Sequence, residues 1–166
     1  MNFTLRSWKL SDIDSLVKYA NNSDIAKFMT DKFPHPYTRD AGFAFISFAT
    51  KDNPKHIFAI DVNGEAVGGI GLHPKEDIES KNAELGYWLA EPFWGNGIIT
   101  KAIGQMLEFG FKTYDINRIF ARPFGTNIAS QRVLEKSGFT FECKFEKTLL
   151  KNGIALDELY YSFLKS

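Results

Sequence analysis

Two glycines separated by one residue, in Trp94-Gly95-Asn96-Gly97, lie between an expected strand and a long expected helix. Glycine lets the backbone fold closely around a guest, because it has no side chain in the way. The first amides of the following helix have no acceptor within the helix, and they lie at the positive end of its dipole. We therefore predict an anion site at this turn, and its natural guest is a phosphate group.

Two common nucleotide-binding patterns do not explain the turn. A Walker loop has four residues between its glycines and continues with Gly-Lys-Ser/Thr, whereas a single residue separates Gly95 from Gly97. A dinucleotide fingerprint needs a third glycine three residues further on, where Thr100 stands. The segment therefore matches neither pattern.

The elements that must position this turn give a mixed α/β chain. Asn63-Gly64 predicts a hairpin, Thr38 is a candidate N-cap, and Ser11 and Asp14 have the spacing of a capping box. Alternating apolar and polar residues over 139–146 predict a strand with one solvent-exposed face. The other expected strands are 3–7, 56–62, 65–72, 83–90, 117–122 and 156–164, and the expected helices are 11–20, 38–48, 97–113 and 127–137. No linker or repeat appears, so we expect residues 1–166 to form a single domain.

Composition excludes several classes of protein. The chain is 44% apolar and 24% charged, which is typical of a globular domain. Twenty basic and twenty acidic residues balance, which argues against a dedicated nucleic-acid binder. A single cysteine excludes an intramolecular disulfide and a multi-cysteine zinc site, and we expect no metal. No apolar run approaches the ~20 residues that cross a bilayer, and the first residues do not resemble a secretory signal, so we expect a cytoplasmic protein.

Two blocks of sequence resemble the GNAT N-acetyltransferases. The strand Glu84-Leu85-Gly86-Tyr87-Trp88-Leu89, followed by Trp94-Gly95-Asn96-Gly97 and a helix, is similar to their acetyl-CoA site, most closely in the RimJ/RimL-like branch that acetylates ribosomal-protein N-termini. The segment 127–139 resembles the family's Asn-x-x-Ser helix and the strand after it. The resemblance implies a mixed, mostly antiparallel sheet that is splayed at the cofactor-binding strands and has helices on both faces.

The resemblance also implies how acetyl-CoA binds. The strand with Trp88 and Leu89 would part from its neighbour 117–122 and leave backbone groups for the pantetheine arm. Asn127 would hold the arm near its thiol end, and the amide of Leu89 could stabilise the oxyanion. The pyrophosphate would rest on the amides of Gly95, Asn96, Gly97, Ile98, Ile99 and Thr100.

Glu84 and Ser130 are the candidate catalytic residues. Glu84 could accept the ammonium proton directly or through water, or it could simply pair with a surface cation. Ser130 could protonate or contact the thiol, or bond back to a helix carbonyl. Many GNAT enzymes have a tyrosine acid where Leu134 stands, and a branch-typical carboxylate corresponds to Thr148.

We therefore expect an acetyl-CoA-dependent N-acetyltransferase. It would move an acetyl group to a primary amine, either a protein N-terminus or a small amine, by direct attack in a ternary complex, with CoA as product. The expected partner is the amine acceptor, without nucleic acid or membrane, and the protein would be a monomer or a homodimer. The alternative is a non-catalytic acyl-CoA-binding sensor with the same fold, which Ile99, Leu134 and Thr148 favour.

Overall fold

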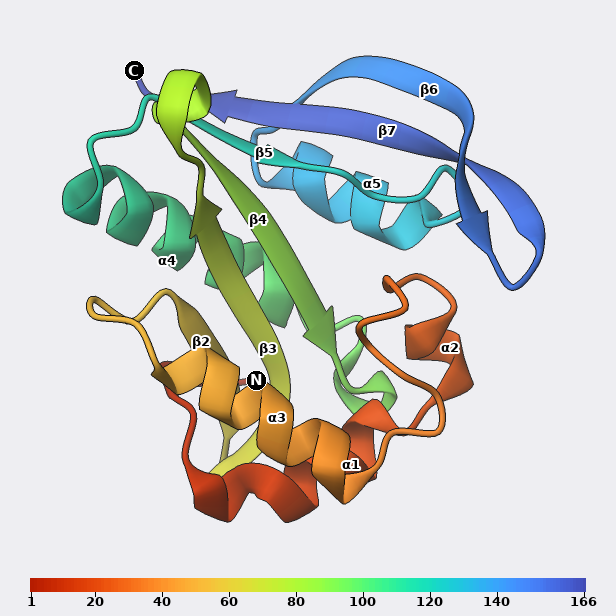
Figure 1. The fold of residues 1–166 in the computed structure, drawn as a ribbon. Coiled ribbons are helices and arrows are strands. Elements are labelled where there is room, and N and C mark those ends of the chain that lie inside the picture. The colour runs from red at the N-terminus through yellow and green to blue at the C-terminus, as the bar shows by residue number, and fades with distance from the viewer. The chain divides into compact units, whose positions relative to one another are not determined.

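The strands form a mixed sheet in the order β1-β2-β3-β4-β5-β7-β6 in the computed structural model, which describes residues 1–166 (Figure 1). β1–β2, β2–β3, β5–β7 and β6–β7 pair antiparallel, whereas β4 and β5 pair parallel. The predicted mixed, mostly antiparallel sheet is confirmed. The strands are β1 (Thr4–Ser7), β2 (Ile57–Val62), β3 (Glu65–Pro74), β4 (Asn82–Leu89), β5 (Arg118–Ala121), β6 (Thr140–Lys151) and β7 (Ile154–Leu164).

Helices and short 3₁₀ turns connect the strands. No helix is both long and apolar enough to cross a membrane. The α-helices are α1 (Ile13–Ala20), α2 (Ser23–Ala26), α3 (Arg39–Thr50), α4 (Ile98–Thr113) and α5 (Ile128–Lys136), and the 3₁₀ turns are η1 (Leu10–Asp12), η2 (Asp77–Glu79) and η3 (Glu91–Phe93).

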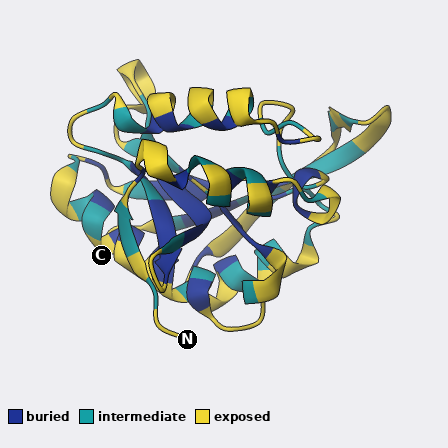
Figure 2. Cartoon of the chain, turned by 90° about the horizontal axis from the view of Figure 1, so that it is seen from below, coloured by how far each residue is buried: buried dark blue, intermediate teal, exposed yellow.

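The chain divides into two compact units, and β3, β4 and α4 contribute to both. The first unit is Met1–Gly71 with Tyr87–Ala102, and the second is Leu72–Gly86 with Ile103–Ser166. The expectation that residues 1–166 act as one domain stays a prediction. Buried residues concentrate along the central strands, and exposed residues lie on the outer sides of the helices (Figure 2).

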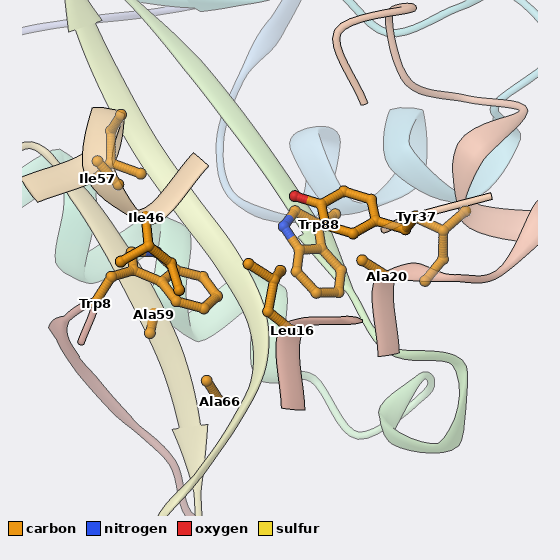
Figure 3. Close-up of a cluster of buried hydrophobic side chains, with 11 residues drawn as sticks. Trp8, Leu16, Ala20, Tyr37, Ile46, Ile57, Ala59, Ala66 and Trp88 are labelled. Atoms are coloured by element: carbon orange, nitrogen blue, oxygen red, sulfur yellow. The ribbon is translucent and has the colours of Figure 1, made fainter. Parts of the chain in front are cut away.

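The first unit has its own hydrophobic core, built from α1, α3 and one side of its strands. Its members include Trp8, Leu16, Ile46 and Trp88, all at most 8% exposed (Figure 3). Beside this core, the Arg6 guanidinium binds both oxygens of Asp12 at 2.8 Å and one oxygen of Asp61 at 2.7 Å. The unit therefore contains a nearly buried ion-pair network next to its apolar interior.

The second unit packs α4 and α5 against β5 and β7. Gly110 lets α4 approach the sheet, because a Cβ there would lie 2.6 Å from Leu72 Cδ1 and 3.1 Å from Ile119 Cδ1. Tyr161 of β7 donates its hydroxyl to Glu135 of α5 at 3.1 Å. The unit thus fixes α5 relative to the end of the sheet.

Two local predictions were wrong. The N-terminal helical segment is not capped by Ser11 and Asp14; the amide of Lys9 donates to Asp12 at 2.8 Å, and a 3₁₀ turn precedes α1. The strand over 139–146 does not have one buried face, because Phe141 and Phe145 are 50% and 45% exposed and a register shift lies between Phe141 and Cys143. A bulge breaks the side-chain alternation that the sequence pattern assumes.

Candidate active site

The glycine turn leaves β4 and leads directly into α4. Gly95 and Gly97 have φ values of +75° and +70°, a conformation that side chains other than glycine rarely adopt. A Cβ at either position would meet no atom within 4 Å, so the space beside the turn is open. The side-chain amide of Asn96 donates to the carbonyls of Phe93 and Trp94, both at 3.1 Å, and holds the loop in this shape.

The start of α4 presents free backbone amides. The first helical bond runs from the amide of Lys101 to the carbonyl of Gly97, at 3.2 Å. The amides of Ile98, Ile99 and Thr100 precede it and therefore have no acceptor within the helix. Gly95, Asn96 and Gly97 are exposed to solvent. Free amides at a helix start suit an anion, and the anion site that the spacing of the glycines indicates stays a prediction.

The two tryptophans near the turn have different environments. The indole of Trp94 donates to the carbonyl of Leu89 at 2.7 Å and is 46% exposed, so it ties the turn to the end of β4. The ring of Trp88 is 8% exposed and belongs to the core of the first unit (Figure 3). Trp88 can therefore offer a cofactor only its backbone groups.

In the second unit, β4 and β5 pair for only a short distance. Their register runs through Asn82↔Arg118, Ala83↔Ile119 and Glu84↔Phe120, and it ends there. β4 continues to Leu89, whereas Ala121 of β5 pairs with Tyr161 of β7. The register between β4 and β5 therefore covers only the first part of β4.

Glu84 lies at the last paired position and forms two ion pairs. Its Oε1 accepts from Nε of Arg122 at 2.8 Å, and its Oε2 accepts from Nζ of Lys75 at 2.9 Å. Partial burial raises the pKa of Glu84, but the hydrogen bonds from Arg122 and Lys75 outweigh it and hold this pKa below its usual range. Glu84 is therefore ionised at neutral pH.

Asn127 caps α5. Its side-chain oxygen accepts from the amide of Ser130 at 3.1 Å, which leaves its NH₂ group as a donor. Ser130 lies in the first turn of α5 and is half-buried. The residue that occupies the position of a tyrosine acid, Leu134, is fully buried.

The predicted site residues fall in both units. Glu84, Asn127 and Ser130 belong to the second unit. The first unit contains Trp88, Leu89, Gly95, Asn96, Gly97, Ile98, Ile99 and Thr100. The sequence patterns do not identify Lys75 and Arg122 as partners of Glu84, because no local spacing connects ion-pair partners that are far apart along the chain.

Comparison with known proteins agrees with this geometry. A family model for the acetyltransferase (GNAT) domain matches residues 2–140. YdaF of Bacillus subtilis, which is provisionally named a ribosomal N-acetyltransferase, is 38% identical over 103 residues, or 62% of this chain and 56% of its own. The ribosomal-protein-serine acetyltransferase of Escherichia coli is 30% identical over 66% of this chain and 62% of its own. These matches therefore span less than two thirds of either relative.

A solved structure extends the likeness to nearly the whole chain. The microcin C7 self-immunity acetyltransferase MccE, in complex with acetyl-CoA and AMP, has a TM-score of 0.84 and 27% identity. The match covers 98% of this chain and 92% of MccE. With a family model over most of its length and a shared fold, this chain belongs to the GNAT acetyltransferase family.

Proposed function

We propose that the protein transfers an acetyl group from acetyl-CoA to a primary amine. The observation that supports this most directly is the open turn at Gly95–Thr100, whose free amides suit a pyrophosphate in a chain of the GNAT family. MccE was crystallised with acetyl-CoA, and this chain shares its fold. CoA is then the released product.

The cofactor contacts follow from the groups that the structure leaves available. We assign the pyrophosphate to the turn amides and the pantetheine arm to the backbone of β4 near Trp88 and Leu89. The NH₂ group of Asn127 is assigned to the thiol end of the arm. These assignments use backbone amides and one amide side chain, which match the donors and acceptors of pantetheine.

The chemistry needs a neutral amine, a stabilised oxyanion and a leaving thiolate. Acetyl-CoA supplies a thioester that the amine attacks directly, and alignment of the two in a ternary complex lowers the barrier. The Leu89 amide is assigned to the developing oxyanion, and Ser130 to the thiolate, whose pKa of about 8.5 makes it a good leaving group. Glu84 is assigned to the amine's proton, and because cations occupy both of its oxygens, it acts through water or after releasing one of them.

The acceptor is a protein N-terminus or a small amine. A relative named ribosomal-protein-serine acetyltransferase supports a protein N-terminus, and such an acceptor would place the enzyme in the cytoplasm. Relatives that are named as N-acetyltransferases support the catalytic proposal over the non-catalytic alternative.

Thiol release from acetyl-CoA tests the proposal. We expect release above background with at least one of spermidine, kanamycin, and peptides that begin with serine or alanine. CoA at 100 times its dissociation constant should also raise the free energy of unfolding by about 2.7 kcal/mol, which is measured as a thermal upshift. Tight CoA binding without release on any amine would make the protein a sensor, and no upshift would remove the cofactor site.

A further inference from the structure

The Arg122 guanidinium is shared between carboxylates on two different strands of the second unit. Its Nε donates to Oε1 of Glu84 at 2.8 Å, and its Nη1 lies 3.2 Å from Oε1 of Glu158 on β7. Glu84 is the last residue of β4 that pairs with β5. The Arg122 guanidinium therefore connects Glu158 to Glu84, the residue at which the pairing of β4 with β5 ends.

The two carboxylates differ in the cations that pair with them. Both oxygens of Glu84 accept from a cation, Arg122 on one and Lys75 on the other. Glu158 pairs with Arg122 through Oε1, and its side chain is only 13% exposed. A carboxylate that is largely removed from water is stabilised by further charged donors. A second charged donor would therefore stabilise Glu158 further.

The backbone around Glu158 is fixed on both sides. The amide of Gly125 donates to the carbonyl of Asp157 at 2.8 Å, and the amide of Leu159 donates to the carbonyl of Pro123 at 3.0 Å. Phe124 forms a β-bridge with Glu158 itself. The same loop continues directly to Asn127, which is assigned to the thiol end of the cofactor. The geometry thus couples the position of Glu158 to that of Asn127.

An aromatic side chain lies on the same side of β7. Residues two apart on a strand share a face, so Tyr160 lies beside Glu158. The Tyr160 ring stacks on Phe120 at 6.0 Å, and the Arg122 guanidinium lies 5.9 Å from its centroid. The Arg122 guanidinium is therefore held near an aromatic ring as well as between two carboxylates.

We propose that Glu158 is the carboxylate that binds the ammonium of the acceptor amine, and that Arg122 is the positioning residue that holds it beside the parted strands. The inference rests on the proposed function. Primary amines are mostly protonated near neutral pH, so they arrive as cations. In this arrangement Glu84 anchors Arg122, and Glu158 selects the acceptor.

Steady-state kinetics of Glu158→Gln test this inference. We expect the KM for spermidine, or for a serine peptide, to rise about 10- to 100-fold, the range of a lost charged hydrogen bond. The KM for acetyl-CoA and the thermal upshift with CoA should stay at wild-type values. Glu142→Gln is the matched control, because Glu142 is also paired with an arginine, Arg118 at 2.6 Å, in the same unit.

Three outcomes separate the possibilities. If Glu158→Gln keeps the amine KM within twofold of Glu142→Gln, Glu158 is only a counterion of Arg122 and the inference fails while the transferase stands. If the wild-type protein acetylates none of the amines, the proposed function and this inference fail together. Should Glu158→Gln not fold, Glu158→Met removes the charge at a similar side-chain length, and a wild-type amine KM in that variant would also overturn the inference.

Discussion

Gly68 faces the backbone of Trp88 so closely that a Cβ on Gly68 would lie 2.6 Å from the Trp88 carbonyl oxygen. The same atom would lie 3.1 Å from Cα of Leu89, so a side chain could be fitted only by moving β4. β4 provides the backbone groups assigned to the cofactor. The glycine on β3 thus sets the position of the strand next to it.

We predict that Gly68→Ala lowers the free energy of unfolding by about 1–3 kcal/mol, the usual effect of overpacking. It should also weaken CoA binding, because β4 must shift. Urea melts and CoA titrations check both effects. Gly104→Ala is the control, since a Cβ at Gly104 meets nothing within 4 Å and alanine favours a helix by up to about 1 kcal/mol. Equal stability of the two variants would contradict the prediction.

Gly97→Asp should abolish CoA binding while the protein remains folded. The substitution puts a carboxylate beside the amides that are assigned to the pyrophosphate, so like charges repel. A Cβ at Gly97 meets no other atom, although its φ of +70° adds local strain. The measurement is the thermal upshift with CoA. Gly104→Asp adds the same charge further along α4 and should keep the upshift; loss of binding in both variants would mean that the turn is not the specific site.

Local chemistry explains why so much of the fold could be predicted from sequence. Asn63 and Gly64 have φ values of 55° and 87°, the conformation that their residue types favour in a two-residue hairpin. Thr38 accepts from the amide of Ala41 and starts α3 as its residue type predicts. The glycines of the turn at 95–97 likewise need only their own conformational freedom.

Contacts between distant segments explain what could not be predicted. Lys75 directly follows β3 and Arg122 directly follows β5, and only the folded sheet brings them to Glu84. α2 was missed because four residues form no periodic pattern, and its start depends on the side chain of Asn22, which accepts from the amide of Asp24. The register shift between Phe141 and Cys143 on β6 was missed as well, because no residue type in this alternating segment marks it.

Arg6→Met should destabilise the protein by about 3–5 kcal/mol at pH 7, because it leaves nearly buried carboxylates without a cation. Asp12 and Asp61 are only 7% and 8% exposed. Urea melts measure the change. Arg39→Met is the matched control, since Arg39 pairs with Asp14 at the surface and exposed pairs contribute about 0–1 kcal/mol. If the two variants lost similar amounts of free energy of unfolding, burial of the ion pair would not determine the effect.

The Arg6 network also predicts a pH dependence. Burial raises the pKa of Asp12, but the hydrogen bonds from Arg6 outweigh it and keep this pKa below the usual 3.8. A lowered folded-state pKa gives stability that is present above the unfolded value and is lost as the pH falls through the folded one. In Arg6→Met, the burial that raises the pKa of Asp12 is opposed only by Lys9, whose amide donates to this carboxylate, so the pKa is higher than in the wild type. The difference in free energy of unfolding between the wild type and Arg6→Met should therefore become smaller from pH 7 to pH 4. A difference that stays constant over this range would rule out the linkage.

Glu84→Gln should lower turnover much more than it weakens CoA binding, because Glu84 anchors Arg122 and is assigned to the acceptor side of the reaction. Thiol release and the CoA upshift measure the two effects separately. The control is again Glu142→Gln, which removes an equivalent ion pair and should change neither. Equal turnover of wild type and Glu84→Gln would remove Glu84 from the mechanism.

The pH profile of turnover tests how Arg122 acts on Glu84. In the wild type, hydrogen bonds keep the pKa of Glu84 below the usual 4.5, so its protonation should cause no loss of activity between pH 5 and 8. In Arg122→Met, the burial that raises the pKa of Glu84 is opposed only by Lys75. The acid limb of kcat should therefore move to higher pH in the variant, in addition to any change in the amine KM. An acid limb at the same pH in both proteins would mean that Arg122 does not control the charge of Glu84.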